Sequence, residues 1–489
     1  MHVSSRLGRH VRALPALMLA LVLAFSSTMV AFANVALTTL STDPYTNTTS
    51  EHQTEVEPDS FSYGSTLVSV TQVGRFTDGG ASNIGWATST NGGTSWTHGF
   101  LPGITIYQGG TYDRVSDPAV SYDPKDNVWL AVSLALAGGT SPHGDAVLVN
   151  RSTDGGLTWS NPVPVKPSPN TFLDKTWIVC DTTSTSPFYG HCYAEWDDNA
   201  AGNLVHMSTS TDGGLSWSVQ RSPADNASGL GGQPVVQPNG TVIVPFSANQ
   251  SANKAFRSTD GGATWSRSVT ISTVQSHSVV ILRTPPLPSA EIDGAGKVFV
   301  AWEDCRFRSS CSSNDIVYSS STNGVTWTAP SRVPIDATTS TVDHFIPGLG
   351  VDKSSSGSTA HVGLAYYYYP VANCTMATCE LNVGFISSTD GGATWSAPTQ
   401  LTGPIKLAWI ANTTQGRMVG DYISTSFSRG KAYPVFSVGK ATLGGNFRQS
   451  LTTVANGLTI QGGTAAATST GAGAIPNVAP EHGILPTAN

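Results

Sequence analysis

Charge is what this sequence most lacks. Asp, Glu, Lys and Arg make up 12% of its 489 residues, against about 25% in ordinary soluble domains. Lys, Glu and Arg favour long surface helices, so their shortage argues against a helical protein. It also argues against a disordered chain, which needs charge to stay solvated. The 25 basic and 32 acidic residues give a net charge of −7, so we expect no nucleic-acid partner.

Long apolar runs are missing too, except near the N-terminus. There, three arginines precede the apolar stretch Ala13–Phe25, and Ala31–Ala33 offers the small residues that a signal peptidase needs. We therefore predict a signal peptide over residues 1–33 and a secreted, extracellular protein. An uncleaved anchor is the alternative, but the stretch is short for a span and polar residues interrupt it. No stable membrane span is expected after removal of the signal.

Cysteine is scarce, and no CxxC motif occurs among the six cysteines. An even number of cysteines in an exported chain favours disulfides over a metal site. Spacing favours local pairing, although six cysteines allow 15 connectivities. The predicted pairs are Cys180 with Cys192, Cys305 with Cys311, and Cys374 with Cys379.

Glycine and proline are plentiful, with 50 and 29 residues, which indicates a turn-rich, mostly β protein. An octamer of the form S-T-D/N-G-G-x-S/T-W recurs at intervals of 48 to 67 residues. Five full copies and one shortened copy occur: Ser89–Trp96, Ser152–Trp159, Ser210–Trp217, Ser258–Trp265, Ser321–Trp327 (shortened) and Ser388–Trp395. Repetition at such a period is typical of repeat architectures.

The octamer has the chemistry of a tight hairpin. Its Asp or Asn can bond turn backbone groups, its glycines supply positive φ, and its Trp can bury a large ring between neighbouring sheets. A calcium- or ligand-binding loop is the alternative. Near-identical copies favour a scaffolding role, because one site usually suffices for function.

A strand–turn–strand pattern precedes each octamer and recurs once after the last. Its seven copies span residues 57–71, 117–133, 174–197, 233–247, 288–303, 346–368 and 419–437. Units of four short antiparallel strands predict an all-β fold, a β-propeller with seven blades; six blades and a degenerate hairpin are the alternative. The last unit is one strand short, and residues 35–40 could complete it and close the ring. The propeller is predicted over residues 34–460, followed by a flexible low-complexity tail, residues 461–489.

The scarce charges gather on one face of the predicted propeller. The octamers turn on one face, whereas the long, non-repeating loops and the starts of the first strands lie on the other. Non-repeating loops are where function usually resides. Charged residues at these starts and loops include Glu57, Arg114, Asp117, Asp174, Lys175, Asp197, Arg283, Glu303, Asp304, Arg306, His344, Arg417 and Asp421.

The octamers resemble the Asp-box (BNR) repeats of the sialidase superfamily, and the resemblance covers roughly residues 50 to 455. It implies a secreted protein that acts on glycans, most often an exo-α-sialidase. Enzymes of that type hold the substrate carboxylate with three arginines. They use a Tyr nucleophile assisted by a Glu, and an Asp serves as acid/base.

Three family positions are replaced in this chain. Val56 stands where the first clamp arginine would lie, and Gln233 where the glutamate would lie. Asn83 stands at the acid/base position, with Asp78 nearby as a candidate catalytic residue.

Other family positions are filled. Tyr422 opens the last blade, as the nucleophile does in the family, so it is a candidate catalytic residue. Arg417, Arg283 and Arg306 are candidates for binding the substrate carboxylate.

Three functions remain open. The first is a sialidase-like hydrolase that removes a terminal acidic sugar. The second is a hydrolase or lyase on another acidic glycan, in which carboxylates or a histidine perform acid/base work; its candidates are Asp117, Asp174, Asp197, Glu303 and His344. The third is a non-catalytic glycan- or cell-wall-binding propeller. We expect a monomer without cofactor, although the pairs Asp197/Asp198 and Glu303/Asp304 could hold a structural calcium ion.

Overall fold

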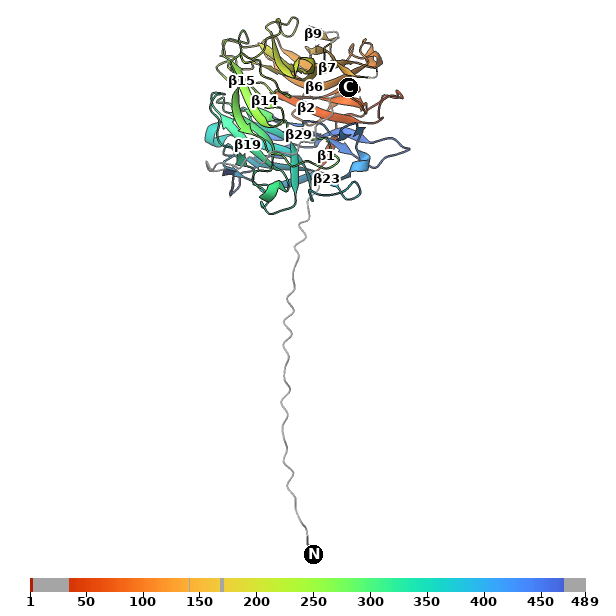
Figure 1. Ribbon diagram of the computed structural model, residues 1–489, viewed down its shortest axis with the longest axis vertical. Helices are drawn as coiled ribbons and strands as arrows, with labels where there is room; N and C mark the ends of the chain where they lie inside the picture. The colour runs from red at the N-terminus through yellow and green to blue at the C-terminus, as the bar shows by residue number, and fades with distance from the viewer. Residues whose placement is uncertain (3–34, 140, 168–170, 470–489) are drawn as a thin grey trace. The chain divides into compact units, whose positions relative to one another are not determined.

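The computed structural model describes residues 1–2, 35–139, 141–167 and 171–469, and its strands belong to one compact unit within residues 34–489 (Figure 1). Apart from Met1 and His2, the predicted signal peptide lies outside the described residues, as does the tail beyond residue 469. In the described part, strands dominate, and helical structure is limited to short 3-10 turns. These are η1 (Ile106–Gln108), η2 (Asn199–Ala201), η3 (Ser309–Cys311), η4 (Gly357–Thr359) and η5 (Leu407–Trp409). The all-β prediction is confirmed.

The strands form antiparallel groups that follow one another along the chain, and we number these groups in chain order. Group 1 contains β2 (Glu55–Tyr63), β3 (Thr66–Arg75), β4 (Ala81–Ser89) and β5 (Thr97–Phe100). Group 2 contains β6 (Arg114–Asp123), β7 (Val128–Ala137), β8 (His143–Ser152) and β9 (Val163–Pro167). Group 3 contains β10 (Leu173–Cys180), β11 (Cys192–Asp198) and β12 (Leu204–Ser210). Single residue pairs join these three groups into one hydrogen-bonded sheet.

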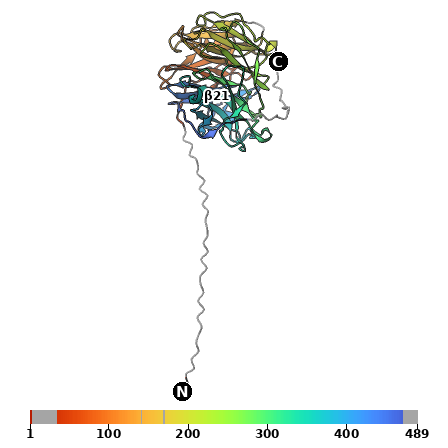
Figure 2. The same cartoon turned by 90° about the vertical axis from the view of Figure 1, so that its left-hand side faces the viewer.

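The next groups form separate sheets. Group 4 contains β13 (Val235–Val236), β14 (Val242–Ala248), β15 (Ala252–Ser258) and β16 (Val269–Thr273). Group 5 contains β17 (Ser289–Ile292), β18 (Val298–Asp304), β19 (Asp315–Ser321) and β20 (Ser331–Arg332). Group 6 contains β21 (Asp343–Val351), labelled in Figure 2, with β22 (Val362–Tyr369), β23 (Glu380–Ser388) and β25 (Thr399–Lys406).

Group 7 draws strands from both ends of the described chain. It contains β28 (Ser424–Ser428), β29 (Lys431–Gly439) and β30 (Gln449–Val454), with β31 (Leu458–Thr459) on β29. The N-terminal strand β1 (Leu37–Thr39) pairs antiparallel with β30, with Leu37 opposite Val454. Short pairs elsewhere involve β24 (Thr394–Trp395), β26 (Asn412–Thr413), β27 (Gly416–Arg417), β32 (Ala465–Ala466) and β33 (Thr468–Ser469).

The last group lies beside the first. In Figure 1 the strands of group 7, drawn in blue, lie next to the red and orange strands of the N-terminal groups. Hydrogen bonds join β2 to β28: the hydroxyls of Ser60 and Ser426 lie 2.9 Å apart, and Ser62 Oγ donates to the Phe427 carbonyl at 2.6 Å. Segments more than 360 residues apart in sequence therefore form one continuous packing arrangement.

The predicted flexible tail, residues 461–489, includes residues that form strands in the structure. Residues 465–466 form β32, which pairs with β24, and residues 468–469 form β33, which pairs with β20. Gly463 allows the close approach, because a Cβ at that position would lie 1.7 Å from the Trp395 carbonyl oxygen. The described chain thus remains part of the β structure as far as Ser469.

The octamers are tight turns, as their composition predicts. In the second copy, Asp154 accepts hydrogen bonds from the backbone N–H groups of Leu157 and Thr158 and from the Ser152 and Thr158 hydroxyls. Burial raises the pKa of Asp154, but these hydrogen bonds outweigh it and lower the value to about 2. Gly155 and Gly156 have φ of 84° and 81°. The Asp154 carboxylate thus finds its hydrogen-bond donors within the turn itself, which supports a scaffolding role for the octamer.

The second glycine of each full octamer, and the single Gly324 of the shortened one, packs against a neighbouring group. A Cβ on Gly156 would lie 2.8 Å from Val68 of group 1, and one on Gly214 would lie 2.8 Å from Leu130 of group 2. The first octamer repeats this contact with the last group: a Cβ on Gly93 would lie 2.2 Å from the Tyr433 ring of β29. Tyr433 also donates a hydrogen bond to the Gly92 carbonyl at 2.7 Å.

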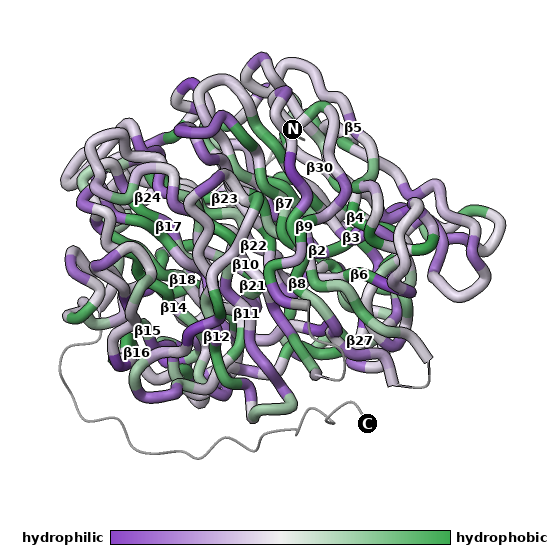
Figure 3. Tube along the Cα trace, turned by 90° about the horizontal axis from the view of Figure 1, so that it is seen from above, coloured by the Kyte–Doolittle hydropathy of each residue, from purple (hydrophilic) through white to green (hydrophobic). Residues whose placement is uncertain are grey.

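Apolar side chains fill the space between neighbouring groups. One buried cluster joins Leu130 and Val149 of group 2 to Ile178 and Trp196 of group 3. Figure 3 shows the same pattern along the chain, with apolar stretches on the strands and hydrophilic stretches mainly in the loops. This alternation is expected when strands are covered on both faces and their turns meet solvent.

The predicted disulfides are confirmed. Cys180 bonds to Cys192, Cys305 to Cys311, and Cys374 to Cys379. Among the described residues, no helix has the length and apolar character needed to cross a membrane.

Candidate functional site

The same irregularity interrupts the first strand in groups 1, 2 and 3. The register between the first and second strands shifts at residues 57, 117 and 175. Glu57, Asp117 and Lys175 occupy these positions with positive φ values of 56°, 47° and 38°. Such a backbone costs a non-glycine residue about 1–3 kcal/mol and is typical of functional sites. Pro58 and Pro118 follow two of them and lack the N–H that a regular ladder would use.

The three bulges bring their side chains to one point. The Lys175 ammonium nitrogen Nζ lies 2.8 Å from Asp117 Oδ1 and 3.4 Å from Glu57 Oε1. It also lies 2.7 Å from Asp421 Oδ2, which comes from the start of group 7. One ammonium therefore contacts carboxylates from three different groups of strands.

Arg283 completes the pairing of Asp421. Its Nε donates to Asp421 Oδ1 at 2.7 Å, and its Nη2 contacts Asp421 Oδ2. The backbone N–H of Asp421 donates to Glu57 Oε1 at 3.2 Å. Gly420, with φ of 146°, makes this approach possible, because a Cβ there would lie 2.8 Å from Glu57 Cα. Glu57 and Asp421 are therefore held side by side.

A buried polar layer supports Glu57 from β3. The amide of Gln72 contacts Glu57 Oε2 and lies 3.1 Å from Ser116 Oγ. Arg75 Nη1 donates to Gln72 Oε1 at 2.9 Å and to the Gly80 carbonyl at 3.1 Å. This layer fixes the orientation of the Glu57 carboxyl group.

The two neighbouring carboxyls differ in acidity. Burial raises the pKa of Glu57 to about 7, although the Lys175 charge opposes the rise. Burial acts in the same direction on Asp421, but there the charges of Arg283 and Lys175 prevail and hold its pKa below the usual value. Near neutral pH, Glu57 can therefore carry a proton while Asp421 stays ionised. Such a split is typical of acid/base pairs in catalytic sites.

Two further carboxyls lie behind Lys175. Asp174 and Asp197 face each other across β10 and β11. Burial raises the pKa of both, and in Asp197 the nearby Asp174 raises it further. Neither carboxylate oxygen of Asp197 has a hydrogen-bond partner within the described chain. Because an unpaired charge would be costly in such a place, Asp197 is held as the neutral acid.

A small cavity adjoins the cluster, and Tyr422 forms part of its wall. Its lining residues are Lys175, Thr176, Trp177, Gly231, Gly232, Gln233, Leu287 and Tyr422. The Tyr422 hydroxyl donates to the Pro118 carbonyl at 2.9 Å, and its ring meets Trp177 edge-on with centroids 5.0 Å apart. Burial, with the nearby Glu57 charge, raises the pKa of Tyr422 well above 10. The phenol is thus a neutral hydrogen-bond donor near neutral pH.

The members of the cluster differ in exposure. Side-chain exposure is 19% for Arg283 and 8% for Lys175. It is 3% for Asp117 and 1% or less for Glu57 and Asp421. Asp174 is half-buried, so solvent reaches a cationic and an anionic group.

Five of the ten predicted catalytic and binding residues gather at this cluster: Tyr422, Arg283, Asp117, Asp174 and Asp197. The others have partners elsewhere. Asp78 forms an ion pair with Arg114, whose Nη2 donates to Asp78 Oδ2 at 3.3 Å. The Asp78 side chain is 46% exposed. Arg306 pairs with Asp304 at 2.7 Å, so this aspartate is not free for calcium.

The predicted arginine clamp does not form around Arg283. Arg417 donates its side chain to the Ile410 carbonyl at 2.8 Å, although its backbone lies beside Arg283. Arg306 is held by Asp304, and Arg283 itself is held by Asp421. The physical reason is local: each guanidinium has an acceptor nearby that holds it away from a common point.

Glu303 and His344 lie in groups 5 and 6. Glu303 Oε2 accepts the N–H of Ile346 at 3.0 Å, which braces a fourth bulge with φ of 49°. His344 is buried against Tyr366 and Tyr368. Burial lowers the pKa of His344 and raises that of Glu303.

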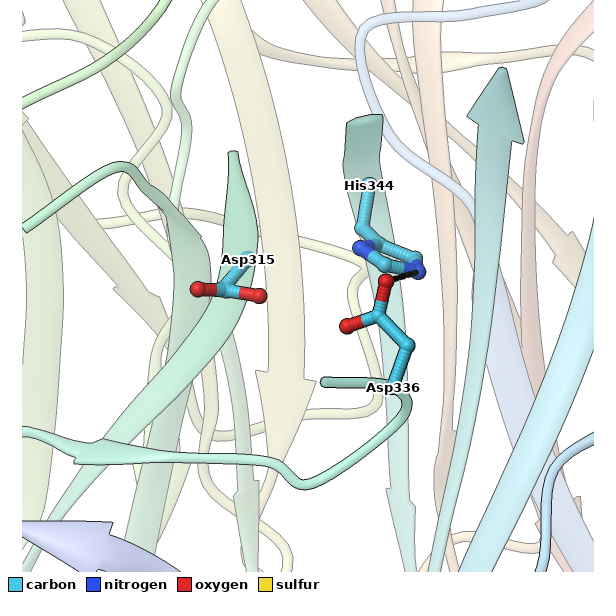
Figure 4. Close-up of side chains that lie close together, drawn as sticks. All are labelled: Asp315, Asp336 and His344. Atoms are coloured by element: carbon cyan, nitrogen blue, oxygen red, sulfur yellow. Dashed lines mark ion pairs between the residues drawn. The ribbon is translucent and has the colours of Figure 1, made fainter. Parts of the chain in front are cut away.

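Asp315, Asp336 and His344 lie close enough to suggest a metal site (Figure 4). Two guanidinium groups already occupy this space. Arg308 contacts Asp315 at 2.5 Å and Asp336 at 2.7 Å, and Arg332 contacts the same carboxylates at 2.8 and 2.5 Å. The trio is therefore neutralised by arginine and does not suit a cation.

The sequence predicts Glu57, Lys175 and Asp421 among the charged residues of one propeller face but assigns them no role in the site. It gives no indication that Gln72 contacts Glu57. A usable signal existed: an acidic residue followed by proline, at 57–58 and 117–118, recurs at the start of a first strand. What the sequence could not reveal is that residues 57, 117, 175 and 421 bend towards one point.

Comparison with known proteins finds similarity over part of the chain. Residues 77–280 match the BNR repeat-like domain. A sialidase of Micromonospora viridifaciens is 32% identical over 124 residues, which cover 22% of this chain and 19% of that protein. The xyloglucanase Xgh74A of Acetivibrio thermocellus is 31% identical over 120 residues, covering 24% and 14%. The chain thus spans less than a fifth of the length of these curated relatives.

Solved structures are similar at low identity. A Hadza microbial sialidase, Hz136, shares 19% identity with a TM-score of 0.42, covering 64% of this chain and 63% of that one. An α-L-arabinanase of Penicillium chrysogenum shares 12% identity with a TM-score of 0.42, covering 86% and 97%.

Proposed function

Because this chain belongs to the sialidase superfamily of BNR-repeat proteins, we propose that it is a glycoside hydrolase that removes a terminal acidic sugar from a glycan. The observation that carries the proposal is the pairing of a protonatable Glu57 with an ionised Asp421 on one lysine. Glu57 donates a proton to the glycosidic oxygen as the bond to the sugar breaks. Asp421 stabilises the positive charge that develops on the sugar, and water completes the hydrolysis.

The charge of the exposed groups supports an acidic sugar. Arg283 is more exposed than Lys175, Asp117, Glu57 and Asp421, whereas Asp174 is half-buried. An anionic sugar is attracted by the Arg283 guanidinium, while a neutral sugar gains nothing from its charge. A sialoside is the first substrate to test, since one curated relative is a sialidase.

The scaffold proposed for this site is a seven-bladed propeller whose ring is closed by β1. Seven groups of strands support it, as does the contact of the first octamer with Tyr433 of the last group, which repeats the contact between every other octamer and its preceding group. β1 completes the last group by pairing with β30. An experimental structure with β1 paired to another sheet would contradict this closure.

The test begins with a glycan library that includes sialosides and uronic-acid glycosides, with products identified by mass spectrometry. On any substrate found, Glu57→Gln should lower kcat/KM by at least about 10²-fold, the usual contribution of a general acid. Glu380→Gln, a change to an exposed glutamate, is the matched control and should leave it unchanged. Full activity of Glu57→Gln would reject the assignment.

The nucleophilic role of Tyr422 stays a prediction of the family resemblance, and the geometry favours the carboxylates instead. The hydroxyl of Tyr422 is bonded to a backbone carbonyl, and its pKa is raised. Tyr422→Phe should therefore keep kcat/KM within about tenfold of the wild-type value, since it removes one neutral hydrogen bond. A loss as large as that of Glu57→Gln would restore the tyrosine as nucleophile.

A second candidate function is glycan binding without turnover. Its supporting observation is the near-complete burial of Glu57 and Asp421, which limits contact with a sugar. The same library distinguishes the two functions: binding without any product would favour the second.

We also propose that the protein is a secreted monomer that needs no cofactor. Three disulfides and the predicted N-terminal signal peptide are consistent with export. Light scattering of the mature protein tests the oligomeric state, and a dimer mass would contradict the proposal.

A further inference from the structure

A second cavity, of about 380 Å³, lies at the opposite ends of the strands that carry the cluster. β2 runs from Glu57 at the cluster to Tyr63 at this cavity, and β21 and β28 end at its wall as well. Its volume falls within the range of small-molecule sites, about 300–1,000 Å³. Within the described chain, none of its lining residues forms an ion pair with Lys175 or Asp421 of the cluster.

One wall of the cavity is aromatic. Phe61 and Tyr63 are two positions apart on β2, so they lie on the same face of the strand. Phe427 belongs to the neighbouring strand β28. Tyr63 is 43% exposed, and its ring lies 4.6 Å, centroid to centroid, from Tyr122, which fixes its position. An exposed ring that is held from behind can stack on the C–H face of a sugar at little cost in entropy.

Residues with hydroxyl groups form a second part of the wall: Ser60, Ser62, Thr182, Ser354, Thr425 and Ser426. Hydroxyls both donate and accept hydrogen bonds, which matches the hydroxyls of a saccharide. Several are fixed by their own contacts; for example, Ser62 Oγ donates to the Phe427 carbonyl at 2.6 Å.

Glu291 and Lys353 face this cavity without forming an ion pair with each other in the described chain. Lys353 Nζ lies 5.0 Å from the centre of the Phe61 ring instead. Each group senses the charge of the other, and burial raises the pKa of Glu291 to about 7. A ligand with several hydroxyls can bridge the two, accepting from the ammonium and donating to the carboxyl.

We propose that this cavity is a carbohydrate-binding site separate from the Lys175 cluster, which holds one or two sugar units without cleaving them. The cavity combines an aromatic platform, fixed hydroxyls and ionisable groups of both signs, namely Glu291, Asp352, Lys353 and Arg429. This combination matches a saccharide better than an anion, since the two carboxyls balance the two cationic groups and would repel an anion. The proposal does not depend on hydrolysis at the Lys175 cluster.

Isothermal titration of the full chain with lactose, cellobiose, maltose and chitobiose tests the proposal, with inorganic sulfate as the anion control. At least one sugar should bind. Tyr63→Ala should weaken its binding about tenfold, as expected for the loss of one aromatic contact, and Glu291→Gln should weaken it severalfold. Tyr107→Ala, an aromatic change outside the cavity, should have no effect.

Glu57→Gln separates this proposal from the proposed hydrolysis. It should lower kcat/KM by at least about 10²-fold and leave sugar binding at this cavity unchanged. The proposal is wrong if no sugar binds, if sulfate binds more tightly than every sugar, or if Tyr63→Ala and Glu291→Gln bind as the wild type does. Thermal melting of each variant shows whether it is folded. If Tyr63→Ala is unfolded, the binding measured for Glu291→Gln still decides the test.

Discussion

Replacing Lys175 by methionine removes the one ammonium that Glu57, Asp117 and Asp421 share. Methionine keeps most of the apolar stem and deletes only the charge. Losing one partner of a buried ion pair costs about 3–5 kcal/mol, because the other charge stays buried and unpaired. We expect the free energy of unfolding to fall by this amount at pH 8. The loss is smaller than the sum over the three contacts of Lys175, since Arg283 still pairs with Asp421.

The loss should shrink as the pH falls. Without Lys175, the carboxyl of Glu57 is neutralised most readily by taking up a proton, so the folded variant binds more protons than the unfolded chain between pH 5 and 8. Each extra proton makes the free energy of unfolding fall by about 1.4 kcal/mol per pH unit as pH rises. The variant should therefore approach the wild-type stability at pH 5.

Urea denaturation at pH 5 and pH 8 measures both effects, because urea does not screen charge. Lys440→Met, a change to an exposed lysine, is the control and should alter the free energy of unfolding by less than about 0.5 kcal/mol. If Lys175→Met behaved like this control, or lost more stability at pH 5 than at pH 8, Lys175 would not be the charge that holds the three buried carboxylates together.

Other predictions concern the whole fold. Burial raises the pKa of Glu55, Glu57, Asp59 and Glu291 to about 7, so their stabilisation is complete below pH 4 and is lost as pH rises through 7; the Tm should be higher at pH 5 than at pH 8, and the reverse order would contradict these pKa values. Replacing Cys180 and Cys192 by alanine opens a loop with a sequence separation of 12 and should cost about 3 kcal/mol, more than the loss of Cys374–Cys379, whose separation is 5; equal urea midpoints would count against this. Removal of divalent ions with EDTA should leave the Tm unchanged, because Arg308 and Arg332 neutralise the Asp315 trio; a fall that calcium reverses would reveal a metal site.

Local chemistry was predictable from the sequence because it depends on neighbours in the chain. The octamer turn is built by Asp154 and the residues within four positions of it. The disulfides close short loops, so their pairing followed from spacing. The scarcity of charge was informative too, since Glu57, Asp117 and Lys175 of the cluster stand near the starts of first strands.

The site itself depends on backbone geometry that composition does not encode. Glu57, Asp117 and Lys175 meet because each adopts a positive φ that their residue types rarely choose. The predicted arginine clamp fails for a related reason. Arg306 lies two residues from Asp304 and forms an ion pair with it rather than joining Arg283 at a common point. Sequence similarity to a family predicts which face matters more reliably than which side chains on that face are free.

The pH dependence of kcat/KM tests the central claim most directly, on the substrate found in the glycan library. If protonated Glu57 is the acid, activity should be present below pH 7 and lost above it, with an apparent pKa of about 7. In Glu57→Gln the remaining activity should be at least about 10²-fold lower and should lack this limb. An alkaline limb that survives unchanged in Glu57→Gln would contradict the account, because another group would then hold the catalytic proton.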